Sequence, residues 1–120
     1  MNEIRFGLSS VPFAWVVHAA RLRGRVLACE DVTDPGAELV LWRRFDPPIK
    51  IKRSGSGRVN EQFARRLRVN VIVEGMGDGQ VVVRASPRNL RAVQATLRDK
   101  AEWQQFLESS RQPRQPVQTC

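Results

Sequence analysis

The amino-acid sequence predicts a small α+β domain: a mostly antiparallel sheet with two longer helices on one face, one short basic helix and a disordered C-terminal tail. Its 120 residues are enough for one domain with one hydrophobic core. In residues 68–85, apolar residues alternate with others on both sides of a glycine-rich turn, which is typical of a β-hairpin. Helical spacing of apolar residues in two further segments completes the pattern. We expect the domain over residues 1–108 and the tail over residues 109–120.

In the first half of the chain, short apolar runs separated by turn residues predict four strands and one helix. Pro12 stands in the first turn of that helix, where proline is favoured, and Gly24 ends it. Asp34-Pro35-Gly36 predicts the turn between the second and third strands. In chain order, we expect a strand at 2–8, a helix at 13–23 and strands at 26–30, 39–45 and 49–53.

A flexible loop and a short helix follow. Residues 54–57 read Ser-Gly-Ser-Gly, a composition typical of loops. Asn60 is expected to cap a helix that ends near Leu67, because asparagine is a favoured N-cap residue. Val59, Phe63 and Leu67 recur at every fourth position and predict its apolar side.

The hairpin is expected to have one apolar face and one mixed face. Side chains alternate between the faces of a strand, so pairing across residues 75–79 defines the two sets. The apolar set is Val69, Val71, Val73, Val81, Val83 and Ala85, and the mixed set is Arg68, Asn70, Ile72, Val82 and Arg84. This pattern favours an antiparallel sheet that is half-buried.

The last helix has a clear start, and it is expected either to bend near Asp99 or to continue straight with a second apolar face. Ser86 is a typical N-cap and Pro87 suits the first helical position. Its buried stripe is expected to be Leu90, Val93, Leu97 and Ala101. On a straight helix, Trp103 and Leu107 fall roughly opposite that stripe. Either the helix bends near Asp99 and returns them to the core, or they form an interaction surface for a second copy or a larger protein.

Charge is strongly sorted along the sequence. The net charge is +8; residues 43–68 hold nine basic and two acidic side chains, whereas residues 26–42 hold four acidic and no basic ones. A local positive field attracts polyanions, so this basic segment predicts nucleic-acid binding. The residues expected to contact phosphates are Arg43, Arg44, Lys50, Lys52, Arg53, Arg58, Arg65, Arg66 and Arg68.

The order of elements in the basic segment favours phosphate contact. Lys50 and Lys52 are expected on one face of a strand, and the glycine-rich loop and the helix start after it offer backbone N–H groups to anions. The helix is expected to present Arg58, Gln62, Arg65 and Arg66 on one side. No Walker A order is present. The alternative is a solvated basic surface, and the excess of arginine over lysine also fits a GC-rich genome.

Two aromatic residues flank the first arginines of the basic segment. Trp42 and Phe45 stand beside Arg43 and Arg44 on a predicted strand, an arrangement that holds single-stranded nucleic acid by stacking. A place in the core is the simpler interpretation for each. No motif of a known RNA-binding module is present, so DNA and RNA are not distinguished.

The sequence contains no recognisable catalytic or metal-binding pattern. His18 is the only histidine, and no carboxylate, nucleophile or further ligand stands at a suitable spacing from it. We therefore expect no enzyme activity, no catalytic residue, no metal and no cofactor. Two functions stay open: a non-catalytic nucleic-acid-binding protein acting through residues 43–68, or a protein-interaction module, such as a small inhibitor or adaptor, that docks on a larger protein or on itself.

The acidic stretch from Glu30 to Glu38 has three interpretations: a solvated loop, an internal partner of the basic segment, or a contact with the basic segment of another copy. Cys29 and Cys120 form no CxxC pair, which favours a reducing compartment and a cytoplasmic location. The longest apolar run, residues 11–20, is too short for a membrane span, so no membrane partner is expected.

Overall fold

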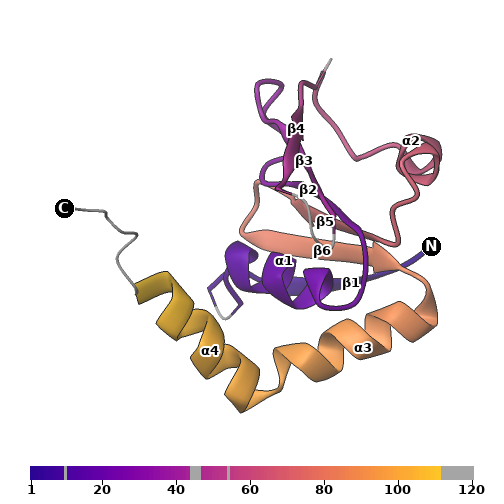
Figure 1. The fold of residues 1–120 in the computed structure, drawn as a ribbon. Coiled ribbons are helices and arrows are strands. Elements are labelled where there is room, and N and C mark those ends of the chain that lie inside the picture. The colour runs from indigo at the N-terminus through magenta and orange to yellow at the C-terminus, as the bar shows by residue number, and fades with distance from the viewer. Residues whose placement is uncertain (10, 44–46, 54, 112–120) are drawn as a thin grey trace.

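The computed structural model of the chain describes residues 1–9, 11–43, 47–53 and 55–111, with side chains described as far as residue 109. Its described part contains a six-stranded mixed sheet in the order β1-β6-β5-β2-β3-β4 (Figure 1). Neighbouring strands are antiparallel except β2 and β5, which are parallel. The strands are β1 Asn2–Gly7, β2 Val26–Cys29, β3 Leu39–Trp42, β4 Ile49–Ile51, β5 Val71–Gly75 and β6 Gln80–Ala85. The predicted α+β class with a mostly antiparallel sheet is confirmed.

The longer helices lie on one side of the sheet and a short helix lies on the other. α1 (Phe13–Arg21) packs on β2 and β5, α3 (Pro87–Leu97) packs on β6 and β1, and α4 (Lys100–Arg111) contacts α1 and α3. α2 (Glu61–Arg66) contributes Ala64 to a separate hydrophobic cluster on the opposite face. Figure 1 shows α2 at the upper right, away from α1, α3 and α4. The sheet thus separates two hydrophobic cores, one on each face.

The hairpin forms with the predicted faces, apart from its first valine, but its register differs from the predicted one by two residues. Pairing across residues 75–79 would set Glu74 opposite Gln80, whereas Glu74 faces Val82 because the strands stay paired as far as Gly75 and Val81. The facing pairs are Val71–Ala85, Val73–Val83 and Gly75–Val81, and the side chains of these valines and the alanine are buried beneath α1 and α3. Val69 is the exception to the predicted apolar face. Arg68 has a positive φ of 58°, so the chain turns before β5 begins, and Val69 packs into the α2 cluster.

The predicted last helix is two helices. The side chain of Asp99 accepts the N–H groups of Ala101 and Glu102 at 2.9 and 3.3 Å, which starts α4 in a new direction. Trp103 is thereby turned towards the domain, with its ring centroid 5.1 Å from that of Trp15. The bend near Asp99 is therefore the alternative that the structure shows. Ala101 is exposed, so its expected place in the buried stripe is wrong.

Other predicted boundaries shift by a few residues. The helix expected at 13–23 ends at Arg21, and the strand expected at 49–53 ends at Ile51. α4 continues to Arg111, three residues into the expected tail, because no proline or glycine lies between Pro87 and Pro113. The expected tail residues 112–120, and residues 44–46 of the expected strand 39–45, lie outside the described residues. Within the described ranges, no helix has the length and apolar character needed to cross a membrane.

Candidate functional site

A groove of about 540 Å³ lies between α2 and the β3–β4 end of the sheet, and we call it the α2 groove. Buried or half-buried apolar side chains form its deeper part, and exposed polar side chains form its rim. The apolar residues are Leu39, Ile51, Val59 and Phe63, and the exposed polar residues of the rim include Lys52, Asn60, Gln62 and Arg66. A groove with an apolar base and a polar rim suits a ligand that carries both kinds of surface.

Two exposed cations reach the rim of the α2 groove from separate elements. Lys52 follows the end of β4, and Arg66 is the last residue of α2. The direction of α2 is set at its start, where Asn60 Oδ1 accepts the N–H of Phe63 at 3.0 Å, as the sequence predicts for the cap. A strand and a capped helix thus place two positive charges on one groove.

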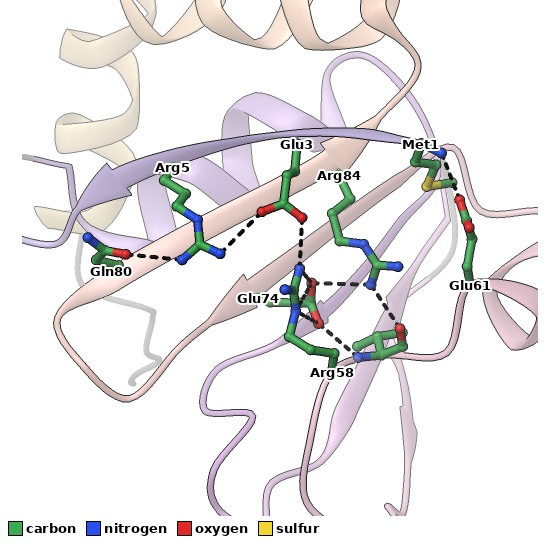
Figure 2. A network of polar contacts seen from close by, with 9 residues as sticks. Met1, Glu3, Arg5, Arg58, Glu61, Glu74, Gln80 and Arg84 are labelled. Carbon is green, nitrogen blue, oxygen red and sulfur yellow. Dashed lines mark hydrogen bonds and ion pairs between the residues drawn. The ribbon is translucent and has the colours of Figure 1, made fainter.

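Arg58 lines the same groove, but its guanidinium is held by the protein itself (Figure 2). Its Nε lies 3.1 Å from each carboxylate oxygen of Glu74, and its Nη2 lies 2.9 Å from Oε1. Nη2 also contacts Glu3 at 3.4 Å. The hydrogen bonds to Glu74 raise the pKa of Arg58 above its ordinary value. Arg58 precedes α2, so the expectation that it shares a helix side with Gln62 and Arg66 is wrong.

Glu74 is the organising group of this network. Its side chain on β5 is fully buried, and it accepts the N–H of Val59 at 2.8 Å in addition to the bonds from Arg58. Arg84 on β6 donates to Glu74 at 3.3 Å and to the carbonyl of Val59 at 2.8 Å. A buried carboxylate requires such partners. Through them, the sheet fixes the segment that forms one wall of the α2 groove.

Arg53 is held in a similar way. Its Nη1 lies 3.3 Å from Cys29 Sγ and 3.3 Å from the carbonyl oxygen of Asp31, and its Nη2 donates to the carbonyl of Gly57. Burial raises the pKa of the Cys29 thiol, against the opposing effect of the Arg53 charge. Arg53 therefore ties the loop before α2 to the loop after β2.

The other basic residues of segment 43–68 are dispersed. Lys50 pairs in register with Val40 and lies 3.8 Å from Glu38, beside a different groove from the one that Lys52 lines. The expectation that Lys50 and Lys52 share one face is therefore wrong, because strand geometry ends at Ile51.

Three more arginines of the segment lie outside both grooves. Arg43 and Arg68 are exposed, and Arg65 is 3.9 Å from Glu61 on α2. Arg44 and Phe45 lie outside the described residues. Trp42 is half-buried, and the guanidinium carbon of Arg21 sits 4.0 Å from the centre of its ring.

The proposed interaction residues on α4 are half-buried. Trp103 packs against Trp15 of α1 and against Phe106, whose ring centroid is 5.7 Å away. Leu107 is also half-buried. These contacts lie within one chain, and a contact of Trp103 and Leu107 with another chain stays a prediction. His18 stacks on Trp15 in this aromatic cluster, as a packing residue does.

Sequence reasoning missed Glu74. The available signal is an acidic residue inside the apolar run Val-Ile-Val-Glu-Gly of β5. Among the residues that the structure describes, no group of three histidine, cysteine or acidic side chains is placed to hold a metal ion. Comparison with protein-family models, with curated proteins and with solved structures found no significant match for this chain.

Proposed function

We propose that this protein binds nucleic acid without catalysis, through phosphate contacts at the α2 groove. The observation that carries the proposal is the meeting of Lys52 and Arg66 on the rim of a groove whose base is apolar. Arg58 and Arg53 are assigned to holding the groove rather than to phosphates, because Nε and Nη2 of Arg58 and Nη1 and Nη2 of Arg53 already donate to groups of the protein. Arg43, Arg65 and Arg68 are the outer residues of the same basic segment.

The chemistry of the groove suits a phosphate backbone with its sugars and bases. Lysine offers a point charge to phosphate, and arginine offers a planar fork of donors. Asn60 and Gln62 carry amides on the same rim, and Phe63 contributes an aromatic ring to the lining. Electrostatic contact with phosphates is largely independent of sequence, so we expect binding with little sequence preference.

The proposal is tested by fluorescence anisotropy with labelled single- and double-stranded DNA and RNA over a salt series. Lys52→Gln combined with Arg66→Gln should weaken binding and reduce the slope of log K against log salt by about 1.4 to 1.8, at roughly 0.7 to 0.9 per lost phosphate contact. The matched control is Arg88→Gln combined with Arg91→Gln, which removes two exposed charges from α3. Equal effects of the two variants, or an unchanged slope in the first, would contradict the proposal.

The second candidate is a protein-interaction module. The observation that favours it is a larger groove on the other side of the sheet, which combines an apolar base with acidic side chains. A partner of this class would bind with a different salt dependence from that of a polyanion at the α2 groove.

A further inference from the structure

A second groove, of about 1000 Å³, lies beside α1 on the face of the sheet opposite α2, and we call it the α1 groove. α1 covers β2 and β5, and α3 covers β6 and β1, so the β3–β4 end of this face is left open. Val40 and Trp42 of β3 are half-buried there, together with Phe13 of α1. An apolar sheet surface that the fold itself leaves uncovered is a candidate contact surface.

The indole N–H of Trp42, which lines this groove, lacks a hydrogen-bond partner among the described residues. Its Nε1 atom is buried. The Arg21 guanidinium stacks 4.0 Å from the ring centre, which shows that a planar cation fits on this aromatic wall. A docked chain that brings further guanidinium groups would suit this aromatic wall.

The lining of the α1 groove is acidic in a protein that is otherwise basic. Four carboxylates line it, those of Glu30, Asp31, Asp34 and Glu38, against the cations of Arg21 and Lys50. Asp31 and Asp34 accept hydrogen bonds from backbone N–H groups of their own loop at 2.9 and 2.8 Å. The carboxylate of Glu38 forms a long ion pair with Lys50, at 3.8 Å, and both side chains are exposed. The groove therefore presents negative charge to an approaching partner.

We infer that the α1 groove binds the basic end of α2 of a second copy, so that copies of the protein associate head to tail. The chain itself supplies the complementary surface: Arg65, Arg66 and Arg68 are exposed at the end of α2. The two surfaces lie on opposite faces of the sheet, and Figure 1 shows α2 standing away from α1. One copy can therefore offer its groove and its helix at the same time, which makes a heterologous contact.

The contact is expected to be weak and sensitive to salt. Exposed ion pairs each contribute little, and salt screens them. The charge of +8 on each copy opposes approach over long distances, but at physiological ionic strength screening acts over about 8 Å, so local complementarity decides the outcome. Arg66 also lines the α2 groove, so a polyanion bound there should compete with assembly.

Sedimentation velocity over a concentration series tests the inference with two charge-reversal variants. The groove variant is Glu30→Lys with Glu38→Lys, and the helix variant is Arg65→Glu with Arg66→Glu. These side chains are exposed or hold only long ion pairs, so both variants should keep the wild-type melting curve. At about 0.1 M salt the wild type should associate and each variant alone should stay monomeric, whereas an equimolar mixture of the two should associate again.

The mixture is the decisive sample, because it supplies one intact groove and one intact helix. A control, Arg88→Glu with Arg91→Glu on α3, makes the same charge change as the helix variant but away from both surfaces. It should keep the wild-type association. A wild type that stays monomeric at every concentration, a mixture that stays monomeric, or a control that loses association overturns the inference. A protein that stays monomeric without nucleic acid at every concentration but binds nucleic acid would refute only head-to-tail assembly. Assembly by a protein that does not bind nucleic acid would refute only the proposed function.

Discussion

Replacing Glu74 by glutamine perturbs the buried network with the smallest change of shape. Glutamine keeps one oxygen acceptor but puts an amide NH2 group in place of the other oxygen. Each oxygen of Glu74 accepts from at least two donors: Oε2 from Arg58 and the N–H of Val59, and Oε1 from Arg58 and Arg84. In either orientation, the amide N–H groups therefore face donors that have lost their acceptor.

The expected cost follows from the burial of those donors. Val59 is buried, and an unsatisfied buried N–H costs about 1 to 3 kcal/mol. The side chain of Arg84 is 15% exposed and cannot be fully rehydrated, whereas that of Arg58 is 36% exposed and regains water, so its share is discounted. Either orientation of the amide leaves one donor, the N–H of Val59 or the guanidinium of Arg84, without its acceptor, and both orientations remove the negative charge that pairs with the arginines. On that basis, Glu74→Gln is expected to lower the free energy of unfolding by about 3 kcal/mol. For a domain of this size, that corresponds to a fall in Tm of about 10 °C.

Chemical denaturation and a thermal melt measure this loss directly. The matched control is Glu3→Gln, which weakens two exposed contacts of Glu3, at 3.4 Å to Arg58 and at 3.3 Å to Arg5, and should melt like the wild type. A loss below about 1 kcal/mol for Glu74→Gln, or an equal loss for both variants, would refute the view that Glu74 organises this part of the fold.

Four further outcomes are expected. Val83→Asp puts an unpaired charge at a fully buried position facing Val73, so the free energy of unfolding should fall by several kcal/mol, and an unchanged melt would disprove the hairpin register. Asp99→Ala removes the cap of α4 and should cost about 1 kcal/mol in the same melt, with a smaller or absent effect showing that α4 does not depend on the cap. Trp103→Ala should cost about 2 kcal/mol, because the ring is half-buried against Trp15; a normal melt with lost association in sedimentation would instead identify an interface between chains. Hydrogen bonds from Thr33 lower the pKa of Asp31 below its ordinary 3.8. Ionised Asp31 therefore stabilises the folded state fully above the ordinary pKa, and this contribution disappears as the pH falls through the lowered pKa. In an acid titration followed by denaturation, Asp31→Asn should therefore lose less free energy of unfolding than the wild type.

The elements that sequence predicted correctly are those set by local rules. Ser86 and Asn60 cap their helices through side-chain oxygens 3.3 and 3.0 Å from the N–H groups of Asn89 and Phe63. Strand alternation places Val73 and Val83 on one buried face. The parallel pairing of β2 with β5 joins segments over 40 residues apart and has no local signature, so the order of strands in the sheet required the structure.

The candidate site was less predictable, because net charge does not reveal which cations are already paired. Arg53 and Arg58 belong to the most basic segment of the chain, yet both guanidinium groups serve internal hydrogen bonds. The partners lie far off in sequence: Glu74 is 16 residues from Arg58, and Cys29 is 24 residues from Arg53. Only the three-dimensional arrangement separates these structural arginines from the exposed Lys52 and Arg66.

The arginines that are held by internal hydrogen bonds also connect the two grooves. Arg58 and Arg53 stabilise the walls of the α2 groove by binding groups that belong to the sheet and to the loop after β2. That loop carries the acidic side chains of the α1 groove, so Arg53 ties the two surfaces together. Replacing Arg53 should therefore disturb both grooves at once, whereas replacing Lys52 should affect only polyanion binding. A polyanion that occupies the α2 groove and the end of α2 removes the basic surface that a second copy's acidic groove requires, so nucleic-acid binding and head-to-tail assembly should exclude each other at Arg66.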